Sequence, residues 1–168
     1  MSTDALLDAL ARTRRQTLAL VEDLDDEQLF QQPASGMNHA AWTLGHLFGL
    51  DAYLADLLSC DSEARLDQQW IAVYGPASAP LAGGAEYEPK QTYLDRLDAV
   101  RSVLMARIGR MSDDDLKGEN PDDRTREHLP TIRHWLDYAL WHEAYHAGQL
   151  SAWRRVLGLP GVGVSFMK

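Results

Sequence analysis

Two histidines near the C-terminal end of the chain have the spacing of a metal-binding pair. His142 and His146 lie four residues apart in a segment compatible with a helix, so both imidazoles fall on one face of one turn. Neutral imidazole is the commonest metal ligand in proteins, and this spacing lets both rings reach one ion without bending the backbone. A single core histidine is more simply explained by a hydrogen bond to a neighbour. Two histidines on the same face of one helix favour a metal site.

The same segment fits the pattern H-E-x-x-H, in which metalloproteases use both histidines as zinc ligands and the glutamate, here Glu143, as a base. The longer form of that pattern takes its third ligand from downstream. Residues 147–168 contain no Asp, Glu or His, and Ala152 stands where the longer pattern has histidine. The sequence therefore disfavours a peptidase. Glu143 keeps two predicted roles, a catalytic base or a partner in an ion pair.

A third ligand must then come from upstream. His46 is the best candidate, because it lies in the middle of an apolar helical face, directly after Gly45. His39 is the reserve: it shares that face seven residues earlier, and its alternative is a capping or surface role in the first turn. His128 and His134 are predicted to be surface residues. Three imidazoles from two helices leave coordination positions for water or substrate, as in catalytic sites, and would accept zinc or nickel.

Helical periodicity predicts four long helices that position these residues. Apolar residues recur at steps of three and four over residues 4–24, from a cap at Asn38 to Cys60, from Pro89 to about Arg110, and from Pro130 or Thr131 to a stop at Gly158 and Pro160. Residues 61–88 are rich in Gly and Pro and read as a long connection, of the length of a crossover or lid. The predicted fold class is all-α, a four-helix bundle.

Aromatic residues on these helices are candidates for a pocket wall near the histidines. They are Trp42, Tyr53, Tyr138 and Tyr145. The alternative for each is an ordinary place in the core, which is commoner for aromatics at helical spacing.

Composition narrows the partners and the compartment. A chain of 168 residues with 45% hydrophobic and 24% charged residues suits one domain over residues 1–168. The net charge of −9 disfavours nucleic acids and anionic lipid surfaces. The single cysteine, Cys60, cannot form an internal disulfide, which favours a reducing cytoplasm. No window approaches the run of about 20 apolar residues that spans a bilayer, so we expect a soluble protein.

Two motifs carry a family resemblance. The segment Trp42-Thr43-Leu44-Gly45-His46-Leu47 and the segment from His142 to Leu150 together resemble the DinB/YfiT-like superfamily, over nearly the whole chain. The resemblance implies a bundle of up-down-down-up topology with a long connection between its second and third helices. It also implies a divalent metal, often nickel or zinc, held by three histidines that correspond here to His46, His142 and His146, and it makes a homodimer plausible.

Characterised members of that superfamily include enzymes that depend on low-molecular-weight thiols. The leading hypothesis is therefore a cytoplasmic metalloenzyme that uses a thiol to transfer to, or isomerise, a small electrophile. One alternative is a metal-dependent hydrolase that uses coordinated water, with Glu143 as the base. Another is a non-catalytic, stress-associated metal-binding protein. The expected partner is a small molecule, with no nucleic acid and no membrane.

Overall fold

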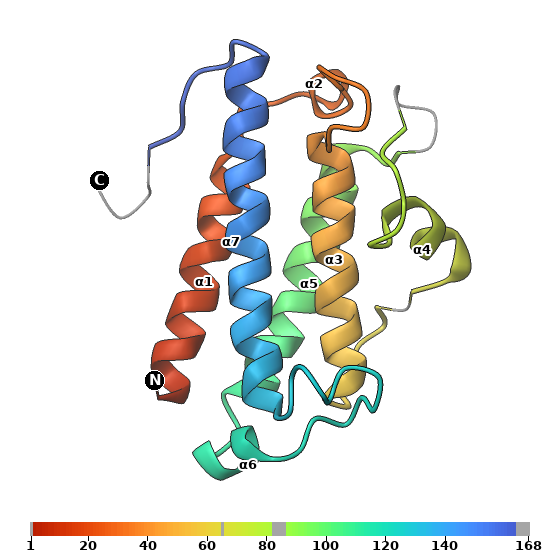
Figure 1. The fold of residues 1–168 in the computed structure, drawn as a ribbon. Helices are drawn as coiled ribbons and strands as arrows, with labels where there is room; N and C mark the ends of the chain where they lie inside the picture. The colour runs from red at the N-terminus through yellow and green to blue at the C-terminus, as the bar shows by residue number, and fades with distance from the viewer. Residues whose placement is uncertain (1, 65, 82–86, 164–168) are drawn as a thin grey trace.

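The computed structural model describes residues 2–64, 66–81 and 87–163, and the regular elements within these ranges are helices (Figure 1). They are α1 (Thr3–Ala19), α2 (Asp26–Leu29), α3 (Ala40–Leu57), α4 (Gln68–Tyr74), α5 (Lys90–Ile108), α6 (Asp113–Lys117) and α7 (Ile132–Val156). One isolated β-bridge pairs Glu119 with Thr131. The predicted all-α class is confirmed.

The four long helices lie side by side, and the short helices α2 and α6 lie at opposite ends of them (Figure 1). α1 packs against α7 and α5, while α3 packs against α5 and α7. Leu44 on α3 and Leu97 on α5 are fully buried in one apolar cluster, and Leu136 on α7 is fully buried in a second cluster with Leu54 of α3. Apolar stripes from different helices thus meet in the interior. Among the described helices, none combines the length and apolar character needed to cross a bilayer.

Two predicted helix ends differ from the structure. α1 ends at Ala19 rather than at residue 24, because the chain turns there while Leu20, Val21 and Leu24 still point into the core. Apolar periodicity therefore continues past the end of the helix. The predicted cap at Asn38 is wrong: His39 has extended backbone angles, and its Nδ1 accepts a hydrogen bond from the Trp42 N–H at 3.2 Å. The predicted stop of the last helix is confirmed, since α7 ends two residues before Gly158.

The connection between α3 and α5 contains a helix that periodicity did not predict. α4 is capped by Asp67, whose side chain accepts from the Trp70 N–H, and it packs on the outer side of α3 (Figure 1). Seven residues are too few for a periodic pattern to stand out. Residues 65 and 82–86 of this connection lie outside the described residues. α4 lies against α3, the helix that carries His46.

Candidate metal centre

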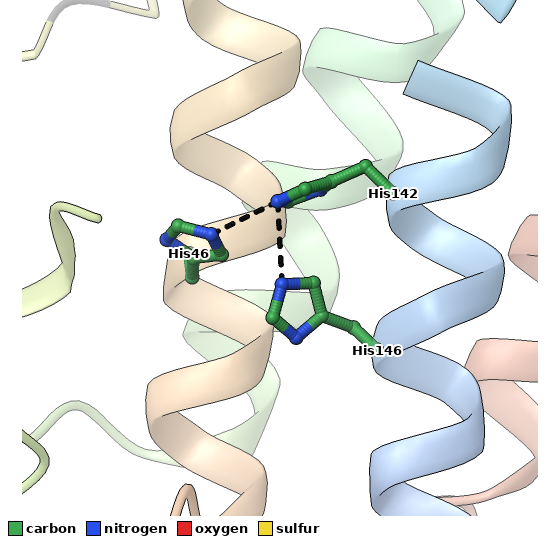
Figure 2. A group of neighbouring side chains, drawn as sticks. All are labelled: His46, His142 and His146. Carbon is green, nitrogen blue, oxygen red and sulfur yellow. Dashed lines mark hydrogen bonds between the residues drawn. The ribbon is translucent and has the colours of Figure 1, made fainter. Parts of the chain in front are cut away.

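Three histidine rings from two helices meet at one point (Figure 2). His46 comes from α3, and His142 and His146 come from consecutive turns of α7. The His142 Nε2 atom lies 3.1 Å from His46 Nε2 and 3.2 Å from His146 Nε2. Each ring offers one nitrogen to a group in which all ligand atoms lie within 4.8 Å of one another. The three residues singled out from helical spacing are thus brought together.

Hydrogen bonds on the far side of two rings fix which nitrogen faces this point. His46 Nδ1 donates to the Tyr74 carbonyl at 2.7 Å, and a carbonyl can only accept. His146 Nδ1 lies 2.8 Å from Gln149 Oε1, an oxygen that also accepts from Asn38 Nδ2 at 3.5 Å. A neutral imidazole carries one proton, so each of these rings presents an Nε2 lone pair inward. Such outer partners are typical of metal-ligating histidines.

His142 differs from the other two rings in the hydrogen bonding of its Nδ1 atom. Its Nδ1 is buried and has no hydrogen-bond partner among the described residues. A proton on His142 Nε2 can donate to only one of the two neighbouring Nε2 lone pairs, those of His46 and His146. The other lone pair then stays buried without a hydrogen-bond donor. With metal–nitrogen bonds of about 2.0–2.1 Å, ligand nitrogens stand roughly 3–3.4 Å apart. The two spacings from His142 Nε2, 3.1 Å to His46 and 3.2 Å to His146, match that range, and the donor set fits a divalent ion.

Burial keeps the three rings in the neutral form that binds metals. Desolvation lowers the pKa of His46, and the hydrogen bond to Tyr74 only partly offsets it. Desolvation, followed by the neighbouring His46, lowers the pKa of His142 to about 4. Desolvation, followed by His142, lowers the pKa of His146 to about 3. Near neutral pH the cluster is therefore a set of lone pairs and not a set of repelling cations.

A cavity of about 540 Å³ adjoins the cluster. His46 and His142 line it, whereas His146 does not. On another side the Trp42 ring stacks on His46, with centroids 4.7 Å apart and planes inclined by 13°. The cluster therefore has one side that opens into a space large enough for a small molecule.

Glu143 faces away from this cavity and belongs to a group of buried charges. The group contains one residue from each long helix: Arg14 of α1, Asp51 of α3, Arg101 of α5 and Glu143 of α7. Arg14 Nε donates to Glu143 at 2.6 Å, and Arg101 Nη2 donates to Glu143 at 2.7 Å. The same two arginines reach Asp51 at 2.8–2.9 Å. This geometry favours the ion-pair role of Glu143 over that of a base.

The surroundings of Asp51 and Arg101 favour the charged form of both residues. Burial opposes the charge on Asp51, but Arg101 and Arg14 outweigh it and lower the Asp51 pKa. Burial likewise opposes the charge on Arg101, and Asp51 and Glu143 outweigh it and raise the Arg101 pKa. Two cations and two anions leave the quartet neutral overall.

The other candidate residues fall at different places. Tyr53 and Tyr138 line the cavity, while His39 and Trp42 do not. His39 is fully buried at the start of α3, so its capping role is confirmed and its surface role is wrong. Tyr145 is on the outer face of α7, with half of its surface exposed. His128 and His134 are exposed, as predicted.

Sequence reasoning missed several residues that shape the site. The Tyr74 carbonyl orients His46, but a backbone carbonyl has no signature in the side-chain sequence. Gln149 was visible only as a member of the inward stripe of the last helix. Asp51 does carry a signal, since a carboxylate in the middle of an apolar helix requires a buried cationic partner.

Comparisons with known proteins show which family the chain belongs to. A search of curated proteins found no match. A solved structure described as a conserved protein of a locus from Enterococcus faecalis superposes with a TM-score of 0.64 at 15% identity, covering 94% of this chain and 99% of that one. At that identity the likeness concerns the fold alone. The family model of the DinB superfamily matches residues 9–150, most of the chain, and the protein therefore belongs to the DinB superfamily.

Proposed function

We propose that this protein is an enzyme in which His46, His142 and His146 hold one divalent ion, zinc or nickel, and that it uses a low-molecular-weight thiol to convert a small electrophile. The observation that carries the proposal is the convergence of three Nε2 atoms beside a cavity. A structural site would have four protein ligands and no adjoining space. Membership of the DinB superfamily, a metal-binding family, adds support.

When bound, a divalent ion lowers the pKa of a thiol and polarises a carbonyl. The chain's own residues supply the rest. Tyr74 and Gln149 hold the His46 and His146 rings with their Nε2 atoms inward. The cavity beside His46 and His142 binds the electrophile against its mainly apolar lining.

The bond changes balance without an oxidant or reductant. In a transfer, the thiol loses its proton to solvent and its sulfur forms a bond to the electrophilic carbon. The leaving group departs with the electron pair of the bond that breaks. In an isomerisation, the thiolate sulfur adds to one carbon of a conjugated double bond, and the π electron pair of that bond moves into the rest of the conjugated system. After rotation about the resulting single bond the pair returns, the C–S bond breaks and the thiolate leaves.

Helix order is part of the proposal. We infer the up-down-down-up topology, and the directions of the helices in Figure 1 support it. There α1 and α7 run from the end near α6 toward the end near α2, and α3 and α5 run the opposite way. This order brings α3 and α7 into contact, which the ligand set requires.

Elemental analysis of the freshly purified protein tests the ion. We expect about one divalent ion per chain in the unmodified protein and much less in His46→Ala. Loss of a direct ligand should lower the metal affinity by more than the roughly 10–100-fold that is typical when an outer partner is removed. His134→Ala is the matched control, since this histidine lies on α7 but is exposed. Equal metal content in all three proteins would rule out the ligand set.

Turnover tests the reaction class separately. The metal-loaded protein is assayed with a panel of electrophiles, each with several cellular thiols, by following loss of free thiol and formation of product. We expect thiol-dependent conversion that disappears after the ion is removed with a chelator. A protein that keeps its metal but converts none of the panel would contradict the enzymatic proposal and favour a non-catalytic metal-binding role.

A further inference from the structure

Much of the wall of the cavity beside the histidines is aromatic, and Leu50, Leu66, Ile71 and Pro76 add to its apolar lining. α4 contributes Trp70 and Tyr74, α7 contributes Trp135 and Tyr138, and α3 contributes Tyr53. These rings also contact one another: the centroids of Trp70 and Tyr74 are 4.3 Å apart, and those of Tyr53 and Trp135 are 5.2 Å apart. The walls are therefore held in place before any ligand arrives.

Polar groups lie at a few places in this lining, which also contains Thr125 and Trp70, whose Nε1 is buried without a hydrogen-bond partner among the described residues. One part is formed by His46 and His142, where the proposed ion would be held. Another is formed by Asp122 and Arg124, which pair with each other at 2.9 Å between Arg124 Nε and Asp122 Oδ1. The Tyr53 hydroxyl donates to the same carboxylate. Asp122 and Arg124 neutralise each other, so the lining away from the histidines offers a ligand mainly apolar contact.

The size of the cavity limits what can fill it. A volume of about 540 Å³ lies within the range of roughly 300–1,000 Å³ that is common for small-ligand sites. Aromatic walls favour a flat ring, because ring pairs gain attraction beyond that of apolar burial alone.

We propose that this cavity binds the aromatic ring of a small substrate, whose reactive polar end lies at His46 and His142. The inference rests on the proposed function and narrows its electrophile to an aromatic compound. It also places the polar remainder of a thiol co-substrate outside the aromatic walls, because those walls offer it few hydrogen-bond partners.

Three hydroxamates with the same metal-binding head test the proposal. Acetohydroxamate has a methyl body, cyclohexanecarbohydroxamate a saturated ring and benzohydroxamate an aromatic ring. Their affinities for the zinc-loaded protein are measured by calorimetry. We expect benzohydroxamate to bind at least about tenfold more tightly than acetohydroxamate, because its ring leaves water. We also expect it to bind about threefold or more tightly than the cyclohexane compound.

Two tyrosines of α7 provide a matched pair of variants. Tyr138 lines the cavity, and its ring centroid lies 5.5 Å from that of His142. Tyr145 lies 5.3 Å from His146 by the same measure but is exposed and outside the cavity. Tyr138→Ala should lose most of the preference for benzohydroxamate while still binding acetohydroxamate. Tyr145→Ala should keep the preference.

The outcomes separate this inference from the metal proposal. If the protein takes up no zinc and binds none of the three compounds, the metal centre itself is wrong. If it binds zinc and all three hydroxamates with equal affinity, the metal centre stands and the aromatic assignment is overturned. An aromatic preference that Tyr138→Ala leaves intact would also overturn it, because the ring would then lie elsewhere. Retained acetohydroxamate binding by Tyr138→Ala shows that the variant is folded and loaded.

Discussion

His39 is a buried histidine whose protonation state is tied to the start of α3. Its Nδ1 accepts from the Trp42 N–H at 3.2 Å, so the ring proton must sit on Nε2, which donates to the Leu81 carbonyl at 3.3 Å. This arrangement needs the neutral ring, because a second proton on Nδ1 would remove the cap. Burial lowers the pKa of His39 to about 4, against two backbone hydrogen bonds that work in the opposite direction.

His39→Asn should remove a pH-dependent part of the stability. The unfolded ring has a pKa near 6.5 and the folded ring near 4. Between these values the unfolded chain binds more protons, so the contribution is complete above 6.5 and is lost as the pH falls toward 4. Between about pH 7.5 and pH 5, the free energy of unfolding should fall about 2 kcal/mol less in His39→Asn than in the unmodified protein.

Urea unfolding at the two pH values measures this difference. Asparagine is a good N-cap and does not titrate, so the helix start is retained and the contributions of the other histidines cancel in the comparison. An identical pH dependence in the two proteins would show that His39 does not titrate as its surroundings require.

Residue-level prediction succeeded where spacing along one helix determines the contact. The positions of His142 and His146 on one face follow from the helical repeat, and the apolar surroundings of His46 marked it as inward. Spacing could not reveal that His39 caps a helix rather than Asn38, because both precede the apolar run. The Tyr74 carbonyl could not be predicted either, since its position depends on how α4 packs on α3.

At the scale of elements, Gly45 is what lets α4 approach α3. A Cβ atom at Gly45 would lie 2.3 Å from two carbons of the Tyr74 ring, far inside contact distance. That ring is held by a hydrogen bond of 2.5 Å between the Tyr74 and Tyr93 hydroxyls. The close approach also places the Tyr74 carbonyl against His46 Nδ1. A glycine in the middle of a helix thus serves the geometry of the metal centre.

Gly45→Ala should therefore weaken metal binding without removing any ligand. The Tyr74 ring must move, and its carbonyl moves with it, so we expect a loss of about tenfold or more in affinity, as for other outer partners. Competition against a chromogenic zinc chelator measures the change. Gly49→Ala is the control: it is one turn later on α3, and its added Cβ would make an ordinary contact of 3.6 Å with the Trp70 ring.

An equal effect of the two substitutions on affinity would contradict this role for Gly45. Alanine by itself favours a helix over glycine by about 0.5–1 kcal/mol, so Gly49→Ala should be neutral or stabilising.

The four long helices were predictable because each has many turns of periodic pattern. α4 was not, since its seven residues obtain their stability from packing on α3.

At the scale of the whole molecule, the quartet of Arg14, Asp51, Arg101 and Glu143 ties the four long helices together. Each helix contributes one charged residue, and all four residues are buried. Such a network fixes how each helix is rotated, because a helix turned away would leave a charge without its partner. Glu143 follows His142 directly and lies three residues before His146. The rotation of α7 that pairs Glu143 with the two arginines therefore also directs both histidines toward α3.

Arg14→Met tests the quartet. It leaves Asp51 and Glu143 with one arginine between them, and we expect a loss of about 3–5 kcal/mol in the free energy of unfolding, as when one partner of a buried ion pair is removed. Arg12→Met is the matched control, two residues earlier on α1, where the arginine pairs with Asp8 at the surface. That change should cost less than about 1 kcal/mol. Urea unfolding near neutral pH measures both, and equal losses would mean that the buried charges do not hold the helices together. The pattern along any one helix could not predict this network, because its four members meet only when all four helices are in place.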